Sequence, residues 1–336
     1  MAGERIHLSV EAARALGEAA LRGIGYDAEE AWIITDHVID AALCGYEYSG
    51  LAKLLNLVES ARFALPRQPM RVLRETPVSV LYDAGNNNGM LALYHATKGA
   101  IAKAASLGIA VVGVTNTWMS GRGAYFAEMI ARADLVGIHT AAASRLVAPL
   151  GGIKPALGTN PMAFGLPGGR GPVIFDMGTS AFMFTELQLR ERLGQQLPEN
   201  VAVGGDGRPT RDPSEARRGA LLPFAGYKGF GLGLIVQALG VLADSARDLE
   251  HDNGCLFIVM KPDLLVPLDQ FKRELDALVD RVKATPRQVG VAEIRIPSER
   301  AFRHREQALK EGLTIDRAVQ DALTVLARRS GPAQRG

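Results

Sequence analysis

The chain has 336 residues, of which 47% are hydrophobic and 22% are charged, an ordinary globular composition for one large domain or two. A formal net charge of +2 gives no indication of binding to nucleic acid or to an anionic membrane. The two cysteines, Cys44 and Cys255, lack metal-ligand spacing and are too few for a disulfide framework, so we expect no metal site and a reducing, cytoplasmic location. The N-terminus has no apolar core behind a basic end, and no apolar run approaches the roughly 20 residues that span a bilayer, so we expect neither a signal peptide nor a membrane partner.

Helical signals dominate residues 9–63. Ser9 is placed to cap the first helix, and residues 27–30, Asp-Ala-Glu-Glu, have the spacing of a capping box for the second. In the third helix, apolar residues recur on one face: Leu51, Leu54, Leu55, Val58 and Ala61. Lys53 falls on the polar side of this helix, where a solvated lysine is expected.

Strands and helices alternate from residue 74 to residue 143, which is typical of an α/β protein. The predicted segments are a strand ending the stretch 74–84, a turn at 85–89, a helix over 90–108, a strand over 109–116, a helix over 124–135 and a strand over 136–143. The following segment, 146–181, is crowded with Gly and Pro. We expect it to be irregular and to line the surface, as long structured loops that carry function often do.

The rest of the chain returns to regular patterns. The predicted segments are a helix near 182–194, a loop over 201–220, a helix starting after the glycines of 224–244, a strand over 255–260, an amphipathic helix over 268–284, a short strand over 293–297 and two C-terminal helices. Thr314 is predicted to begin the last helix, and residues 330–336 are predicted to form a flexible tail.

The stretch GVTNTWMSGRGAY, residues 113–125, joins a predicted strand to a predicted helix through a glycine-containing turn. Backbone amides at such a helix start can hold an anion. The turn offers Asn116, Thr117, Ser120 and Arg122, but no group that titrates near neutral pH. Zinc spacing, a P-loop, a Ser-His-Asp arrangement and a G-x-G-x-x-G fingerprint after the first strand are all missing from the sequence, so an ordinary Rossmann site is not expected.

Several short motifs remain, and their order along the chain is distinctive. They run GIAVVGVTN, G-x-G-A-Y, APLGG, GTNP, D-x-x-TS, PTRDP, PF-x-GYKG-x-GL and RIPSER. Together they resemble the type-2 malate/L-lactate dehydrogenase family, which also holds ureidoglycolate and sulfolactate dehydrogenases and the piperideine/pyrroline-2-carboxylate ketimine reductases. The resemblance covers residues 5 to 325.

The resemblance implies a non-Rossmann α/β fold with a large central sheet and helical N- and C-terminal parts. The expected units are an N-terminal helical part (1–72) that packs with the C-terminal segment, a central cofactor-binding region (73–245), a C-terminal part that completes the substrate domain (246–329) and the tail (330–336). The family resemblance further implies a homodimer whose site lies between domains. The expected reaction is NAD(P)-dependent hydride transfer at a carbon next to a carboxylate.

The motifs on the cofactor side are mostly intact. By resemblance, they predict contact with the cofactor for Ser120, Gly121, Arg122, Thr159, Asn160, Pro161, Asp176, Thr179, Ser180 and Lys228. Glycines on both sides of Lys228 let backbone approach a ligand closely, and a lysine at a helix start is unfavourable unless an anion is near. NADPH is the preferred cofactor by resemblance to the ketimine reductases, with NADH as the alternative.

The substrate side departs from the family pattern. Ser49 stands where the family has its usual acid/base histidine, and Lys53 stands where an arginine is expected to hold the substrate carboxylate. Met119 replaces a second histidine, and Glu186 replaces a lysine. None of the six histidines falls on a family catalytic position: His7, His37, His95, His139, His251 and His304.

Two readings of these departures follow, and both place Tyr48, Ser49 and Lys53 at the substrate. A ketone needs a proton donor, whose loss costs roughly 10²–10⁴-fold in rate, whereas a cyclic ketimine can arrive already protonated. The missing histidines therefore favour reduction of a small imino acid by a ketimine reductase. Alternatively, Tyr46 or Tyr48 acts as the acid for a 2-oxo acid, with its pKa lowered by Lys53 or Lys228. A third alternative is a binding or regulatory homologue that has lost catalysis.

Overall fold

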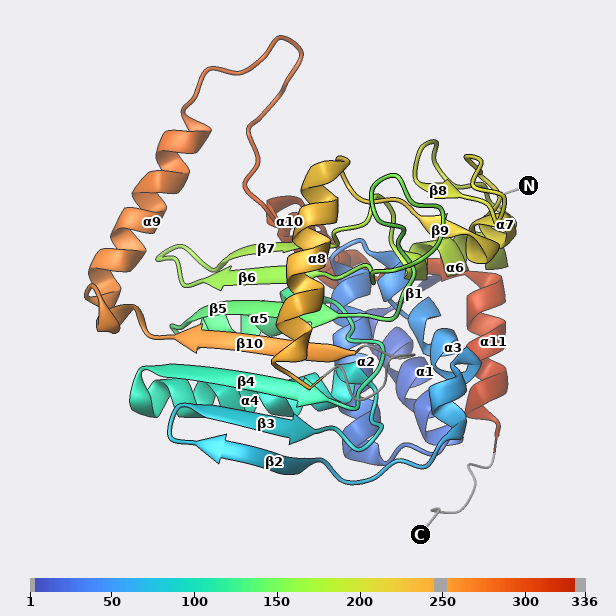
Figure 1. Ribbon diagram of the computed structural model, residues 1–336, viewed down its shortest axis with the longest axis horizontal. Helices are drawn as coiled ribbons and strands as arrows, with labels where there is room; N and C mark the ends of the chain where they lie inside the picture. The colour runs from blue at the N-terminus through green and yellow to red at the C-terminus, as the bar shows by residue number, and fades with distance from the viewer. Residues whose placement is uncertain (1–3, 245–252, 330–336) are drawn as a thin grey trace.

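The computed structural model describes residues 4–244 and 253–329, and a seven-stranded mixed sheet forms its centre (Figure 1). The strand order is β2-β3-β4-β10-β5-β6-β7. The strands are β2 (Arg71–Thr76), β3 (Ser79–Asp83), β4 (Ile109–Thr115), β5 (Val136–Ala142), β6 (Met162–Leu166), β7 (Val173–Met177) and β10 (Gly254–Met260). Only β3 and β4 pair in parallel, and the other neighbours are antiparallel. This pattern confirms the predicted α/β fold and is not the mostly parallel sheet of a Rossmann domain.

Helices cover both faces of the middle of the sheet. Helices α4 (Gly89–Leu107) and α5 (Gly123–Arg132) lie on one face, and α8 (Tyr227–Val241) crosses the other in front of β5 and β10 (Figure 1). The middle strands are therefore continuous apolar runs. Val112, Phe257 and Val259, for example, are fully buried.

A second body of helices packs beside the sheet. It contains α1 (Val10–Gly23), α2 (Ala28–Leu43), α3 (Ala52–Glu59), α10 (Glu299–Glu311) and α11 (Arg317–Ala327), with the short 3₁₀ helices η1 (Glu47–Ser49) and η2 (Ala61–Ala64). Ser9 caps α1, and the capping box of Asp27 and Glu30 is formed, as predicted. The two ends of the described chain meet here, because β1 (Arg5–Leu8) pairs antiparallel with β11 (Leu313–Asp316).

That pairing corrects one prediction. Thr314 does not begin a helix but lies in β11, opposite His7, and α11 starts at Arg317. The alternation of buried Leu313 and Ile315 with exposed Thr314 is the period of a strand, and its partner lies at the other end of the chain. The sequence of so short a strand does not indicate which other strand it pairs with.

The predicted irregular segment 146–181 also contains regular structure. The stretches MAFGL and VIFDM form the antiparallel strands β6 and β7, which extend the sheet beyond β5. Each strand has only five residues, and the Gly and Pro residues on either side made the segment look irregular in the sequence. The predicted loop over 201–220 likewise holds β8 (Ala202–Val203), α7 (Pro213–Arg218) and the start of β9 (Ala220–Leu221).

Two of the four remaining predicted segments differ from the structure and two agree with it. Helix α8 begins at Tyr227 and so includes the glycines that were expected to precede it. Residues 293–297 form no strand. The predicted helices near 182–194 and 268–284 are confirmed as α6 (Phe184–Arg192) and α9 (Leu268–Lys283), with η4 (Pro262–Leu264) before α9.

The end of α9 stands away from the sheet, and the chain returns from it in an extended arm over residues 284–297 (Figure 1). The predicted tail, 330–336, lies outside the described residues, and so does the predicted boundary at 245–246. The other domain limits stay a prediction. Across the described ranges, every helix is too short or too polar to cross a membrane.

Candidate active site

The predicted substrate and turn residues come together beside η1. Tyr48 and Ser49 lie on η1, which follows α2 and runs into α3. Charges on Glu186 of α6, Asp176 of β7 and Arg122 of the 117–122 turn all act on the Tyr48 hydroxyl. These segments are far apart in the sequence, so the fold assembles one site from a 3₁₀ helix, a turn and a strand end.

Asp176 occupies the anion site that the sequence predicts at the start of α5. Its Oδ2 accepts a hydrogen bond of 2.8 Å from the Ala124 N–H, and its carboxyl also meets the Gly123 N–H. The anion held by this helix start is therefore a side chain of the protein and not a ligand. Burial raises the Asp176 pKa, whereas these amides and nearby Arg122 oppose the rise.

Arg122 is buried and its charge is already paired. Its Nη1 lies 2.5 Å from Asp40 Oδ2 on α2, and its guanidinium stacks over the Tyr46 ring at 5.1 Å. Asp40 is also bound by Arg305 of α10, at 2.8 Å. Arg122 therefore fixes the turn to α2 and α10, and the cofactor contact predicted for it stays a prediction.

His37 of α2 packs against the same turn and holds its backbone. Its Nε2 accepts a hydrogen bond of 2.8 Å from the Arg122 backbone N–H, and Gly121 passes so close that a Cβ there would lie 2.4 Å from Nε2. Gly121 has a φ of 87°, so only glycine suits this approach. Burial, and the charges of Lys53 and Arg122, lower the His37 pKa well below its usual value. The sequence shows His37 only as a position among the apolar residues of α2, so it gives little signal for this role.

Lys53 is not the solvated lysine that its place on the polar side of the helix favours, and the substrate contact predicted for it stays a prediction. It is only 4% exposed in α3, and among residues 4–244 and 253–329 no carboxylate pairs with it. Burial lowers its pKa to about 8. Ser49, which is also buried, makes no side-chain hydrogen bond to any part of the described chain. A buried cation without an anion is costly, so this position is suited to a negatively charged ligand.

Tyr48 lines a hollow of about 500 Å³ between η1, α6 and α10. Its ring meets the Tyr46 ring edge-on at 6.2 Å. Burial raises its pKa, and Glu186 and Asp176 add to the effect, while Arg122 opposes it. The lowered pKa that a tyrosine acid needs is therefore not found, because burial, and then the negative neighbours, outweigh Arg122.

The cofactor-side motifs form a clasp at the ends of β5 and β7. Asn160 is fully buried; its Oδ1 accepts from Ala143 N–H at 3.0 Å, and its Nδ2 donates to Gly233 O at 2.8 Å. Thr179 donates through both N and Oγ1 to Thr159 O, at 2.9 and 3.1 Å. The Ser180 hydroxyl donates to Phe182 O, and Pro161 O accepts from Ala141 N–H. Many of the hydrogen-bonding groups of these motifs therefore bind one another and α8, and so hold the two loops and this helix together.

The first turn of α8 lies beside this clasp. Gly226 at the N-cap has a φ of 62° and no side-chain capping bond, and the turn contains no acidic residue. Lys228 is exposed there, and Gly229 is so tightly packed that a Cβ would lie 2.2 Å from Phe224 O. This uncapped helix start with a lysine has the charge to accept an anionic group. Ser120, by contrast, is half-buried against the start of α4, where its Cα lies close to Gly89.

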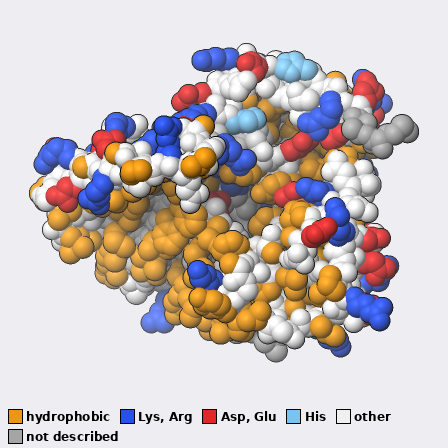
Figure 2. Space-filling view, turned by 90° about the horizontal axis from the view of Figure 1, so that it is seen from above, with side chains coloured by type: hydrophobic (Ala, Val, Ile, Leu, Met, Phe, Trp, Pro, Cys, Tyr) orange, Lys and Arg blue, Asp and Glu red, His pale blue; other side chains and the backbone are white. Residues whose placement is uncertain are grey.

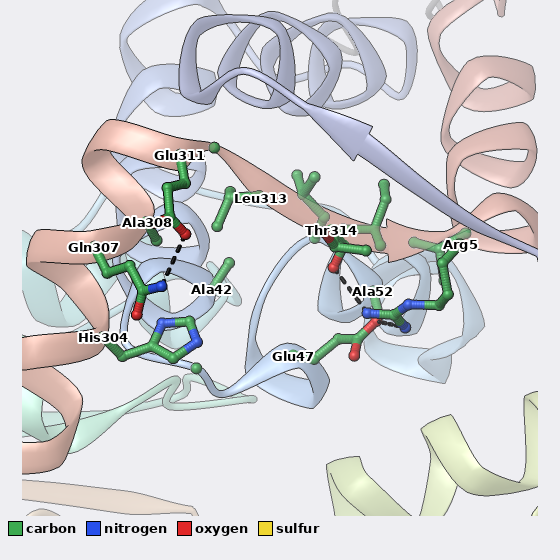
Figure 3. A pocket seen from close by; sticks show the side chains of 15 residues that line it. Arg5, Ala42, Glu47, Ala52, His304, Gln307, Ala308, Glu311, Leu313 and Thr314 are labelled. Carbon is green, nitrogen blue, oxygen red and sulfur yellow. Dashed lines mark hydrogen bonds and ion pairs between the residues drawn. The ribbon is translucent and has the colours of Figure 1, made fainter.

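A separate hollow of about 310 Å³ lies on the other side of η1 (Figure 3). His304, Gln307 and Glu311 of α10 face it from one side, and Arg5 and Glu47 form an ion pair at the other. None of the residues predicted for the substrate or the cofactor lines it. Of these two hollows, the one beside Tyr48 is therefore the one that contains a residue predicted for the substrate.

Comparisons with known proteins agree with this fold and motif set. Residues 8–324 match the family described as malate/L-lactate dehydrogenase. The L-sulfolactate dehydrogenase of Methanothermobacter thermautotrophicus is 30% identical over 89% of this chain and 90% of its own. The Delta(1)-pyrroline-2-carboxylate reductase of Ancylobacter novellus is 32% identical over 97% and 99%. The structure of a dehydrogenase from Sinorhizobium meliloti matches with a TM-score of 0.88, 28% identity and coverage of 97% and 99%.

Proposed function

The chain belongs to the malate/L-lactate dehydrogenase family, and we propose that it is an NAD(P)H-dependent reductase of a small imino or oxo acid, with cyclic ketimines favoured. The observation that carries this proposal is Lys53, a buried cation without a carboxylate partner in the described chain. A substrate carboxylate bound there would supply the missing charge. Lysine offers a point charge in place of arginine's fork, so it fixes the position of a carboxylate more than its orientation.

The surroundings of Tyr48 favour a C=N substrate over a C=O substrate. A ketone needs a proton as its oxygen becomes an alkoxide, but the raised pKa of Tyr48 makes this phenol a weaker acid. His37 is kept neutral, and its Nε2 lone pair is taken by the Arg122 N–H. A ketimine that arrives protonated needs neither group.

The cofactor is proposed to bind at the clasp and the first turn of α8. The reduced nicotinamide supplies the hydride. Lys228 and the start of α8, which no side chain caps, suit a phosphate of the dinucleotide. Thr179, which is bonded to Thr159, lies beside Gly229 and Gly233 of the same helix. NADPH remains the preferred form and NADH the alternative.

One observation favours a second candidate, a 2-hydroxy acid dehydrogenase. Asp176 acts electrostatically on Tyr48, and burial raises its pKa although the Ala124 and Gly123 amides and Arg122 oppose the rise, so this carboxyl could exchange a proton beside Tyr48. Asp176→Asn separates the two functions. It should remove most reduction of 2-oxo acids while leaving reduction of a protonated imine within about tenfold.

The test starts with calorimetric titration of the protein with NADPH and, separately, NADH. We expect micromolar binding of one of them. NADPH or NADH oxidation is then followed with Δ1-pyrroline-2-carboxylate, Δ1-piperideine-2-carboxylate and a series of 2-oxo acids. Faster turnover of the cyclic imines supports the ketimine reductase; faster turnover of 2-oxo acids supports the second candidate. Tight cofactor binding with no turnover of either class would identify an inactive homologue, and no cofactor binding would overturn the proposal.

We also propose that the enzyme is a homodimer, on the basis of the apolar face. We define this face as the exposed apolar side chains of α8 and its entry: Phe224, Tyr227, Leu232, Leu234, Ile235, Val241 and Leu242. Figure 2 shows hydrophobic side chains gathered into a broad area on one side of the molecule. Soluble monomers rarely expose so large an apolar patch, so a second copy is proposed to cover it.

Light scattering tests the homodimer directly. The wild type should have twice the chain mass of 35.9 kDa, and Ile235→Asp should be monomeric. Val72→Asp, which changes a similarly exposed apolar residue on β2, is the matched control and should remain dimeric. A monomeric wild type would contradict the proposal.

A further inference from the structure

Glu186 of α6 brings a negative charge to the hollow beside Tyr48. Both residues line this hollow, and α6 packs against η1 and α3, which carry Tyr48 and Lys53. Burial contributes most to the raised pKa of Tyr48, and the charge of Glu186 comes next, ahead of the other charged groups. The Glu186 carboxylate is therefore close enough to act on the reacting atoms of a substrate that lies at Tyr48.

Only part of the Glu186 carboxylate is used within the protein. Arg190, four residues further along α6, donates to Oε1 through Nη2 at 3.1 Å and through Nε at 3.3 Å. Oε2 makes no hydrogen bond within residues 4–244 and 253–329. The Glu186 side chain is 27% exposed, so Arg190 holds the carboxylate while one oxygen remains open to a hydrogen-bond donor on a ligand.

The other carboxylates near Tyr48 are less suited to a cationic ligand. Asp176 already accepts from the backbone amides at the start of α5 and does not line the hollow. Glu47 and Asp316 both bind Arg5, at 2.7 and 2.8 Å. Besides Tyr48 and Glu186, the charged or titratable residues that line the hollow are Arg5, Tyr46, Glu47, Arg190, Arg300 and Asp316. Of the carboxylates that line it, Glu186 has the greatest effect at Tyr48.

The sign of the charge beside the reacting atoms distinguishes an imine from a ketone. Hydride addition to a protonated imine forms a C–H bond at the alpha carbon and moves the π electrons of C=N onto nitrogen, so the iminium becomes a neutral amine and the nicotinamide is left oxidised. A ketone starts neutral, and its oxygen becomes negative. A nearby carboxylate favours the protonated imine and opposes the alkoxide. Glu186 stands where the family pattern has a lysine, so the charge at this position is reversed.

We propose that Glu186 is a specificity-determining residue, which selects substrates with a protonated C=N bond by accepting a hydrogen bond from the iminium N–H. The inference rests on the proposed function, because it takes the reacting end of the substrate to lie at Tyr48 and its carboxylate at Lys53. Glu186 binds the cationic form of the imine, and so keeps the substrate protonated above the pKa that the imine has in water. A 2-oxo acid gains nothing from this contact.

The test compares two ligands that differ in one ring atom. Proline is the reduced form of Δ1-pyrroline-2-carboxylate and has a cationic ring nitrogen, whereas tetrahydrofuran-2-carboxylate has a neutral oxygen in the same place. The affinity for each is measured by calorimetry, with and without NADPH. We expect proline to bind about tenfold more tightly, because its N–H forms a charge-assisted contact with the carboxylate. Glu186→Gln should remove this difference without changing the affinity for tetrahydrofuran-2-carboxylate, and Glu186→Asp should restore part of it.

Glu191→Gln is the matched control. Glu191 lies on the same helix, is 30% exposed and pairs with Arg217 at 2.7 Å, but it does not line the hollow. This variant should keep the preference for proline. Equal affinities in the wild type, no binding of proline, or equal weakening of both ligands by Glu186→Gln would overturn the inference. Failure of the proposed function is recorded separately, as no oxidation of NADPH or NADH with any cyclic imine or 2-oxo acid, because the binding comparison does not depend on turnover.

The pH profile of an active enzyme gives a second readout. The kcat/KM for Δ1-pyrroline-2-carboxylate should fall as the pH rises above the pKa of the bound imine, and Glu186→Gln should move this fall about one pH unit lower. At low pH, kcat should change by less than about threefold, since the substrate is then protonated in both proteins. Lys53 is present in both, so its own titration near pH 8 does not enter the comparison. A lower kcat with an unchanged pH profile would assign Glu186 a structural role and overturn the inference.

Discussion

We call η1 and α3, which carry Tyr48, Ser49 and Lys53, the helical wall. This wall and the clasp at the ends of β5 and β7 use their polar residues in opposite ways. In the clasp, Asn160, Thr179 and Ser180 are buried and hydrogen-bonded to backbone within the protein. In the helical wall, Ser49 and Lys53 are equally buried but make no side-chain hydrogen bond or ion pair within the described chain. The polar side chains of the clasp already have hydrogen-bond partners in the protein. Those of the wall have none within the described chain, and a ligand could supply them.

This difference explains which motifs resemble the family and which depart from it. Replacing a clasp residue would leave buried backbone groups unpaired, so the clasp has little freedom to change while the fold is kept. The wall holds ligand-facing groups whose partners lie outside the protein. Such groups can be exchanged with little change to the fold, as Ser49 and Lys53 illustrate. Specificity is therefore expected to reside in the wall.

The largest effect on stability should come from Asn160→Ala. The variant leaves Ala143 N–H and Gly233 O without their partner, and it puts alanine at a φ of 39°. We expect a loss of about 2–4 kcal/mol in the free energy of unfolding, measured by urea denaturation. Asn200→Ala is the matched control, because Asn200 also has a positive φ, 61°, but is exposed. A loss no larger than that of the control would show that the clasp bonds are not stabilising.

For the helical wall we expect the opposite effect on stability, a gain instead of a loss. Lys53→Met removes a buried charge that has no partner in the described chain, so the folded protein should gain about 1–3 kcal/mol at pH 7. The KM for a carboxylate substrate should rise about a hundredfold. Lys103→Met, which removes a lysine paired with Glu75, is the control and should not stabilise. A destabilised Lys53→Met variant would assign Lys53 a structural role.

The sequence predicts the two regions unequally. The clasp motifs are contiguous, and their order along the chain predicted the fold class by resemblance, while capping signals and apolar periodicity predicted most of the elements. The wall depends on contacts that no local pattern shows: Lys53 is on the polar side of a helix by periodicity, yet it is buried, because α3 packs against α1, α6 and α11. The Asp176 carboxylate at the start of α5 and the pairing of β11 with β1 are likewise contacts between distant segments.

The pH dependence of ligand binding tests whether the charge of Lys53 binds the ligand carboxylate. Its pKa is lowered to about 8 from 10.5, so it is charged below pH 8 and loses its proton above it. Affinity for a carboxylate ligand should fall up to tenfold per unit above pH 8, and Lys53→Met should remove this dependence. Because the folded pKa is the lower one, the cost of burying the charge is fully present below pH 8. Stability should therefore rise as the pH increases from about 8 to 10.5, relative to the variant.

The smallest effect is expected from Tyr48→Phe. The hydroxyl makes no hydrogen bond to any described residue, and its raised pKa makes it a poor acid. Reduction of a protonated cyclic imine should change by less than about threefold in kcat, because the substrate brings its own proton. If 2-oxo acids are the true substrates and Tyr48 is the donor, their kcat should fall by roughly 10²–10⁴-fold in the same variant. Measuring kcat for both substrate types on one preparation shows whether Tyr48 donates the proton or the substrate arrives already protonated. A large loss of kcat for imines as well would make the Tyr48 hydroxyl part of both reactions.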